Sequence, residues 1–272
     1  MISAPAIFLF CALPCEAKPL VAHFRLKKNL ETQAFTIYSN AEINLTVTGV
    51  GKTAMAAGVG YTLALLAPRT PAILVNVGVA GHRQHDLGEI FSVEKITDAD
   101  SGRNHFPPLL ARQPGATAAI TTVSSPHLEY RDDCLYDMEA SAFYESAARF
   151  TTGELIQCLK VISDNSASPA GNIRAKQVAN LLAGSIDALQ ALLGEMTPLA
   201  ATLAVPSPLD AIQLPRDLHF TSSQRNLLHK QLSRYQVLSN GELPDFSKNR
   251  WRTSKELLQW LAEEIGDIPV VL

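Results

Sequence analysis

Three acidic residues lie where an apolar strand pattern ends or a helical pattern begins. Glu16 follows an apolar run at residues 7–12, Glu139 precedes an Ala-rich helical pattern, and Asp164 ends the segment LKVISD. A carboxyl group can protonate a leaving group, activate a water molecule or stabilise a developing positive charge. Each acid taken alone is more often a helix cap or a solvated loop residue. Three of them at the ends of strands could converge on one pocket.

The elements that would position these acids are apolar strands that alternate with helical patterns. Strand patterns cover residues 7–12, 35–39, 43–48, 73–77, 89–96, 118–123 and 156–162, and helical patterns cover residues 15–24, 52–66, 139–150 and 172–193. This alternation predicts an α/β fold in three layers, with a mostly parallel central sheet covered by helices on both faces. Ligands bind beyond the carboxyl ends of the strands in such sheets. The candidate site is therefore the set of strand ends at 14–16, 49–52, 78–81, 124–127 and 163–165.

Composition sets the class of protein. The chain has 272 residues, of which 47% are hydrophobic and 18% charged, and its formal net charge is -3. These values predict a globular protein, and the slightly acidic balance gives no reason to expect nucleic acid or a membrane as a partner. The four cysteines form no C-x-x-C pair, and the apolar N-terminal run lacks a basic segment before it. We therefore expect reduced thiols, no metal site and a cytoplasmic location.

The amino-acid composition of the chain changes after Leu193. Residues 197–217 are rich in proline and small residues, which predicts a linker, and two amphipathic helices are predicted at 223–237 and 254–265. Thr253 or Ser254 would cap the second of these helices. We expect a catalytic domain over residues 1–193 and a linker with a helical extension over 194–272. The leucine faces of the extension are too small for an independent core, so we expect the segment after Pro215 to dock on the catalytic domain of its own or the neighbouring subunit. There it would either support the fold or cover part of the pocket mouth.

Two short motifs resemble ligand-binding sites, one for phosphate and one for a metal ion, but neither pattern is complete. TGVGKTAMAAG resembles a phosphate-binding loop, but Thr46 stands where that pattern needs its first glycine. The motif is instead a glycine-rich turn from strand to helix, in which Gly51 is the better candidate for contact with a ligand. HRQH places His82 and His85 three residues apart without an evident third metal ligand, so a solvated loop is the preferred interpretation.

Five segments in order resemble the purine nucleoside phosphorylase and nucleosidase superfamily, most closely its 5′-methylthioadenosine/S-adenosylhomocysteine nucleosidases. They are ALPCEAKPL, TGVGKTAMAAG, LVNVGVAGH with LGEIFSVEKITDAD, YDMEASAFYESAARF and LKVISDNS, which together span about residues 7–193. The resemblance implies a nucleoside phosphorylase-like fold, a homodimer and no cofactor.

The same resemblance implies roles for particular residues. Glu16 would activate the attacking water, and Asp164 would protonate N7 of the purine as the glycosidic bond breaks. Glu139 would accept hydrogen bonds from the ribose hydroxyls with Met138 against the sugar, while Asp137 would serve the helix N-terminus. The remaining substrate contacts implied are Gly51, Val79, Ala80, Gly81, Ser163 and His127.

The activity implied is hydrolysis of the N-glycosidic bond of a 6-aminopurine nucleoside, such as 5′-methylthioadenosine or S-adenosylhomocysteine. Phosphorylases of the superfamily carry an arginine near the end of the strand ILVNVG, where this chain has Asn76. Water is therefore the expected nucleophile, although Lys52 and Arg83 keep a purine nucleoside phosphorylase open. Val79 and His82 replace the usual serine and glycine, which leaves open another adenine nucleoside, of the futalosine or adenosylhopane type. A non-catalytic nucleoside-binding subunit is the remaining alternative, but it would need neither a water activator nor a leaving-group acid.

Overall fold

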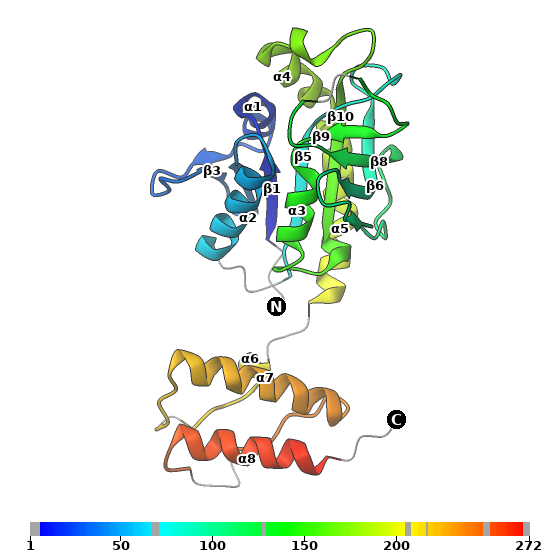
Figure 1. Ribbon diagram of the computed structural model, residues 1–272. Helices are drawn as coiled ribbons and strands as arrows, with labels where there is room; N and C mark the ends of the chain where they lie inside the picture. The colour runs from blue at the N-terminus through cyan, green and yellow to red at the C-terminus, as the bar shows by residue number, and fades with distance from the viewer. Residues whose placement is uncertain are drawn as a thin grey trace. The chain divides into compact units, whose positions relative to one another are not determined.

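The computed structural model describes residues 6–66, 71–126, 129–204, 208–215, 217–246 and 251–268. The chain divides into two compact units, Met1–Ala204 and Val205–Leu272, and each is described by itself (Figure 1). No helix in these ranges is long and apolar enough to cross a lipid bilayer.

The first unit is an α/β structure built around one sheet (Figure 1). Its strands in the described residues are β1 Ile7–Cys11, β2 Lys27–Lys28, β3 Thr36–Ser39, β4 Ile43–Val47, β5 Ile73–Gly81, β6 Ile90–Asp98, β7 Asn104–His105, β8 Ala116–Thr122, β9 Leu135–Asp137 and β10 Ile156–Asp164. The strand order is β10-β6-β8-β9-β5-β1-β4-β3-β2, with β7 paired to β6 and β10 paired to β5 as well. The sequence patterns predicted most of these strands, but not the short strands β2, β7 and β9.

The sheet is mixed, with both parallel and antiparallel strand pairs. Strand β1 pairs in parallel with β4 and β5, and β10 pairs in parallel with β5, which places the carboxyl ends of these four strands at one edge. Some of the antiparallel pairs are hairpins, since a tight turn can join only antiparallel strands. Strands β3 and β4 form such a hairpin, in which the Asn40 side chain accepts the N–H groups of Glu42 and Ile43 at 2.8 and 2.7 Å.

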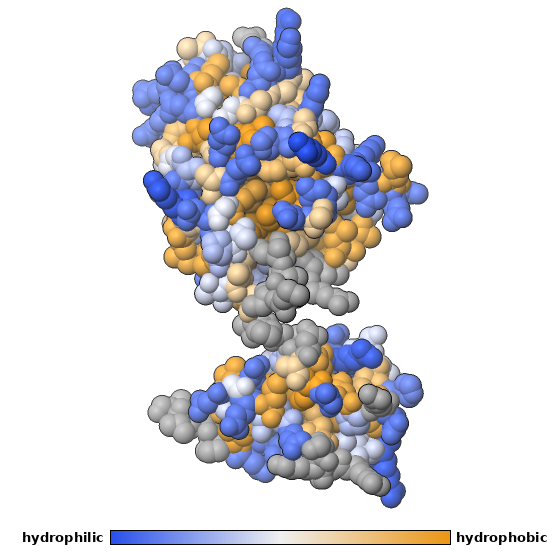
Figure 2. Space-filling model, turned by 180° about the vertical axis from the view of Figure 1, so that it is seen from behind, coloured by the Kyte–Doolittle hydropathy of each residue, from blue (hydrophilic) through white to orange (hydrophobic). Residues whose placement is uncertain are grey.

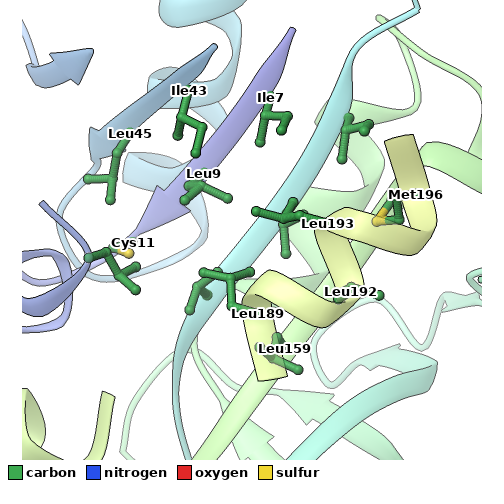
Figure 3. Packing of buried hydrophobic residues seen from close by; sticks show 14 of the residues in the cluster. Ile7, Leu9, Cys11, Ile43, Leu45, Leu159, Leu189, Leu192, Leu193 and Met196 are labelled. Carbon is green, nitrogen blue, oxygen red and sulfur yellow. The ribbon is translucent and has the colours of Figure 1, made fainter. Parts of the chain in front are cut away.

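Helices pack on both sides of the sheet because alternate side chains of a strand point to opposite faces. The helices of this unit are α1 Pro14–His23, α2 Lys52–Leu66, α3 Ala140–Ala147, α4 Ala175–Gly184 and α5 Ile186–Leu203, with short 3₁₀ turns at Gly153–Leu155 and Ala170–Asn172. Ile7, Leu9 and Cys11 of β1 belong to a buried cluster with residues of α1, α4 and α5 (Figure 3). Phe8 and Phe10 belong to a second cluster with residues of α2 and α3.

The end of this unit differs from the expectation in two ways. The helix predicted over 172–193 is broken at Ser185, which is fully buried and whose hydroxyl donates to the Leu182 carbonyl at 2.9 Å. Helix α5 then continues to Leu203, through residues that we expected to form a linker. Burial of Met196 and Ala200, four residues apart on one face, explains this continuation despite a proline inside the helix. The first unit therefore ends near Ala204.

The second unit contains α6 Pro208–Ala211, α7 Ser222–Leu238 and α8 Ser254–Asp267. The Thr253 hydroxyl accepts the Glu256 N–H at 3.2 Å, which confirms the predicted cap of α8. The leucines of α7 and α8 pack against one another in one cluster, whose buried members are Leu228, Leu232, Phe246, Leu257, Leu258, Leu261 and Ile265. These faces are thus covered within the unit, contrary to our reason for expecting docking. Docking itself stays a prediction.

Candidate active site

A cavity of about 420 Å³ opens at the carboxyl ends of β1, β5 and β10. The predicted site residues that line it are Glu16, Val79, Ala80, Gly81, Met138, Glu139, Ser163 and Asp164. Gly51 contacts the site through a hydrogen bond to Glu139, and His127 lies outside the described residues. The structure therefore brings together residues from distant parts of the sequence, from Glu16 to Asp164.

Glu16 lies in the first turn of α1, where the free backbone N–H groups of a helix favour a negative charge. Its Oε2 accepts the Leu13 N–H at 2.8 Å, and its Oε1 accepts the Val79 N–H at 3.0 Å. Burial raises the pKa of Glu16, while these two hydrogen bonds oppose the rise. A Cβ at position 78 would come within 2.9 Å of Oε1, so Gly78 makes room for the carboxylate. Both oxygens are fixed, and the raised pKa makes the ionised group a stronger base.

Glu139 directly precedes α3 and is also buried. Its Oε1 accepts the Gly51 N–H at 2.7 Å, across 88 positions in the sequence. Gly51 has a φ of +98°, a conformation that favours glycine and aims its N–H at the carboxylate. Burial raises the pKa of Glu139 to about 7, the charge of Asp137 adds to the rise, and the charge of Lys160 opposes it.

Asp137, which lines the cavity, forms an ion pair with Lys160. The Lys160 Nζ lies 2.8 Å from the Asp137 Oδ2, with both side chains almost fully buried. The same oxygen accepts the Ala140 N–H at 2.8 Å, which confirms the predicted role of Asp137 at the start of the helix. Burial disfavours the charged form of Lys160, but the nearby Asp137 outweighs it and keeps the pKa of Lys160 above its ordinary value. We missed Lys160, although a lysine in an otherwise apolar strand is a signal that a buried partner must exist.

Asp164 ends β10 at the base of the cavity. The Ser163 hydroxyl donates to its Oδ1 at 2.5 Å, and the Tyr130 hydroxyl donates to its Oδ2. A Cβ at position 81 would lie 2.4 Å from that Oδ2, so Gly81 is required for this approach. Nothing in the sequence pattern singles out Tyr130, because its partner is 34 positions away and it lies in a segment without regular periodicity.

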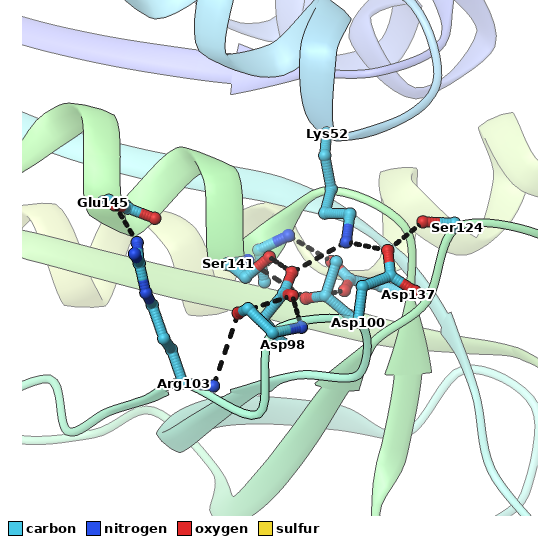
Figure 4. A network of polar contacts seen from close by, with 11 residues as sticks. Lys52, Asp98, Asp100, Arg103, Ser124, Asp137, Ser141 and Glu145 are labelled. Carbon is cyan, nitrogen blue, oxygen red and sulfur yellow. Dashed lines mark hydrogen bonds and ion pairs between the residues drawn. The ribbon is translucent and has the colours of Figure 1, made fainter.

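Lys52 belongs to a polar network beside the cavity (Figure 4). Its Nζ lies 2.8 Å from the Asp98 Oδ2 and 2.5 Å from the Asp100 Oδ2. Ser141 donates to Asp98 at 2.8 Å, and Ser124 donates to Asp100. Burial opposes ionisation of Asp98, but the hydrogen bonds from Lys52 and its neighbours hold the pKa of Asp98 well below its usual range. The Lys52 ammonium is therefore bound by two carboxylates.

The histidines of HRQH are held in a turn. The His82 Nδ1 accepts the N–H groups of Gln84 and His85, both at 3.1 Å, so its proton is assigned to Nε2. That Nε2 lies 3.3 Å from an Asp133 carboxylate oxygen. Burial lowers the pKa of His82, which favours the neutral ring. His82 thus ties the end of β5 to the segment that carries Tyr130.

Neither protein-family models nor curated protein sequences match this chain. Several solved structures do match it. The chain shares the fold of purine nucleosidases.

Three of these structures illustrate the likeness. A 5′-methylthioadenosine/S-adenosylhomocysteine nucleosidase from Streptococcus pneumoniae is 17% identical, with a TM-score of 0.58 over 70% of this chain and 99% of that one. The Helicobacter pylori enzyme of the same name is 11% identical, with a TM-score of 0.59 over 71% and 100%. Futalosine hydrolase from Helicobacter pylori is 13% identical, with a TM-score of 0.58 over 71% and 98%. At these identities the likeness establishes the fold, and the activity must be argued from the site.

Proposed function

We propose that this protein hydrolyses the N-glycosidic bond of a 6-aminopurine nucleoside, such as 5′-methylthioadenosine or S-adenosylhomocysteine. The observation that carries the proposal is the convergence of three buried carboxyl groups, Glu16, Glu139 and Asp164, on one cavity. Hydrolysis of a nucleoside can use a carboxyl group at three places, namely at the attacking water, at the ribose and at the leaving base. The shared fold with the methylthioadenosine/S-adenosylhomocysteine nucleosidases and futalosine hydrolase supports the same reaction class.

The proposed reaction divides the work among these residues. Asp164 gives a proton to N7 while the C1′–N9 bond breaks and its electron pair moves into the purine. The ribose ring then carries positive charge, which the carboxylate of Glu139 stabilises as it accepts hydrogen bonds from the sugar hydroxyls. A water molecule forms the new bond to C1′, and its proton goes to Glu16. Solvent returns that proton to Asp164, so the enzyme ends as it began.

The charges around the cavity favour water over phosphate as the nucleophile. Arg174 is the only cationic side chain among the described residues that line the cavity, against four acidic ones, Glu16, Asp137, Glu139 and Asp164. Lys52 is bound by Asp98 and Asp100, so it is not free to hold phosphate. A phosphate dianion normally needs a fixed cationic fork. Arg174 is the observation that keeps a purine nucleoside phosphorylase as the second candidate.

Apart from Arg174, the rest of the wall suits the thioether part of a 5′ substituent. Apolar or weakly polar residues line it, namely Ala12, Leu13, Cys15, Val50, Val123, Pro126, Ala170, Ile173, Ala175 and Val178. Binding pockets for small molecules are typically apolar with a few polar groups that fix orientation. A thioether substituent fits this lining.

The proposal includes a homodimer in the cytoplasm, with the three-layer arrangement of the nucleoside phosphorylases. An exposed apolar loop supports an interface, since Phe106 and Leu110 are 65% and 67% exposed. Hydrophobic residues also reach the surface between hydrophilic ones on the face in Figure 2. Free thiols at Cys11 and Cys158, both buried, are compatible with a reducing compartment.

The test is to incubate the purified protein with a panel of purine nucleosides, with and without phosphate, and to identify the products by mass spectrometry. We expect free adenine and a reducing sugar at a rate independent of phosphate. A strict need for phosphate, with a sugar 1-phosphate as product, would establish the phosphorylase. Binding of the nucleoside without release of base would leave a non-catalytic nucleoside-binding subunit.

A further inference from the structure

Tyr130 is a buried residue of the first unit whose hydroxyl donates a hydrogen bond to the Asp164 Oδ2. It is not one of the described residues that line the cavity. Its hydroxyl therefore reaches Asp164 from behind the cavity wall. This position allows Tyr130 to act on the proposed leaving-group acid without touching the substrate.

The hydrogen bond of Tyr130 has a defined direction. A phenol has a single proton to donate, and the Tyr130 hydroxyl donates it to the Asp164 Oδ2. Burial raises the pKa of Tyr130, and the hydrogen bond to Asp164 raises it further. Tyr130 therefore stays protonated and acts as a permanent donor.

The backbone conformation and the packing of Tyr130 show that the surrounding structure must hold this side chain in place. Tyr130 has a φ of +40°, which is rare for a bulky residue and marks a conformation that the surroundings must hold. Its ring approaches the end of β5 so closely that a Cβ at position 81 would lie 2.6 Å from it. The Tyr136 ring packs against it at 6.1 Å, and the contact between Asp133 and His82 anchors the same segment. A role in filling space alone would require neither this backbone nor the directed hydroxyl.

The two oxygens of Asp164 have different partners. Oδ2 faces the fixed donor Tyr130, so it can only accept. Oδ1 faces Ser163, whose hydroxyl also lies 3.5 Å from the Ala80 carbonyl and can turn toward it. A proton on Asp164 is therefore accommodated on Oδ1.

We propose that Tyr130 is the positioning residue of the leaving-group acid: it reserves the Asp164 Oδ2 as an acceptor, fixes the plane of the carboxyl group and thereby places the proton for N7 on Oδ1. This proposal rests on the proposed nucleosidase function. It predicts that Tyr130 matters only when the leaving group needs a proton.

The test compares two substrates that differ in this need. One is 5′-methylthioadenosine, and the other is a 4-nitrophenyl riboside with the same 5′ group, whose nitrophenolate leaves without protonation. In Tyr130→Phe we expect kcat for 5′-methylthioadenosine to fall by about 10–100-fold with KM within about threefold, because an acid catalyst is misplaced but binding is kept. Turnover of the nitrophenyl substrate should stay within about twofold, which also shows that the variant is folded.

Tyr144→Phe is the matched control, since Tyr144 is a partly buried tyrosine of α3 that packs on His105 and does not line the cavity. It should behave as the wild type on both substrates. Unchanged turnover of 5′-methylthioadenosine by Tyr130→Phe, or an equal loss on both substrates, would overturn the role of Tyr130 alone. Absence of base release by the wild type would overturn the nucleosidase function, and the role of Tyr130 with it.

Discussion

Two of the buried carboxyl groups, Glu16 and Asp164, are surrounded by different kinds of hydrogen-bond donor. Backbone N–H groups of Leu13 and Val79 hold Glu16, and such groups can only donate. They therefore suit an ionised carboxylate, the form that takes a proton from water. Hydroxyl groups of Ser163 and Tyr130 hold Asp164, and the Ser163 hydroxyl can turn away. The two environments are therefore consistent with the proposed roles of Glu16 as a base and Asp164 as an acid within one cavity.

The acid assignment predicts the behaviour of Asp164→Asn. The amide keeps most hydrogen bonds but cannot deliver a proton, so we expect kcat to fall by about 10²–10⁴-fold. Affinity for adenine, measured by calorimetry, should change by less than about threefold. Asp187→Asn, on the exposed face of α5, is the control and should leave both values unchanged. Wild-type turnover in Asp164→Asn would show that the base leaves without this residue.

The pKa of Glu139 predicts a pH dependence. In the proposed reaction Glu139 accepts hydrogen bonds from the ribose hydroxyls as a carboxylate, and burial raises its pKa to about 7. Below that pH it is mostly protonated and above it mostly ionised, so kcat/KM should rise as pH increases through about 7. Because the pKa of Glu16 is also raised, the rise of kcat/KM with pH should reflect the ionisation of both carboxyl groups.

Glu139→Gln separates these two contributions. The variant should have a lower kcat/KM and an ascending limb that lies at lower pH, measured by base release between about pH 5 and 9. A limb that stays where it is in the wild type would show that Glu139 does not titrate in this range.

At the level of elements, the ion pair of Lys160 and Asp137 joins β10 to β9 inside the structure. Removing one partner of a buried pair leaves an uncompensated charge, which costs about 3–5 kcal/mol. We therefore expect Lys160→Met to lower the free energy of unfolding by that amount in urea denaturation. The double variant Lys160→Met with Asp137→Asn should recover part of the loss.

An exposed pair of opposite charges provides the control. Arg103 and Glu145 lie 2.8 Å apart, but their side chains are 64% and 45% exposed. Arg103→Met should change the free energy of unfolding by less than about 1 kcal/mol. An equally small effect of Lys160→Met would mean that Asp137 is protonated or solvated when the lysine is absent.

Local patterns predicted the elements, and with them the strand ends where the acids meet. The apolar run before Glu16 is one unbroken stretch of sequence, and so is the segment that ends in Asp164. The local pattern was therefore sufficient to place each of these two strands. The break at Ser185 and the helix beyond Leu193 depend on burial against the sheet, which composition does not report. Tyr130 depends on a contact made only after folding. What the sequence could not predict is therefore the set of partners, rather than the place of the site.

At the level of the whole molecule, the boundary between the two units changes how the extension should be tested. Helix α5 buries Met196 and Ala200 in the main cluster of the first unit. The second unit has a separate cluster of its own from α6, α7 and α8, while Leu227 and Val237 of α7 remain exposed. Docking of the second unit on the first would have to use such exposed residues rather than the buried leucines that we first considered.

Two truncations separate these contributions. A chain that ends at Ala204 keeps every buried residue of the first unit, so it should fold and release base. A chain that ends at Leu193 loses Met196 and Ala200, whose removal exposes the cluster and should lower the melting temperature by at least several degrees, or cause aggregation. Equal melting temperatures for the two chains would show that the end of α5 is not part of the folded unit.

Docking is tested with the same boundary. Residues 205–272, produced as a separate chain, should bind the chain that ends at Ala204 and raise its melting temperature, because the two units would bury apolar surface such as that of Val237. A change of substrate preference upon this binding would mean that the extension covers part of the cavity mouth, whereas a change of stability alone would mean that it only supports the first unit. Val237→Asp should weaken the association, and Ser233→Asp, at a polar position of the same helix, should weaken it less. Equal melting temperatures of the first unit in the full chain and in the chain that ends at Ala204 would contradict docking, because a linked unit is present at an effective concentration of about 1 mM.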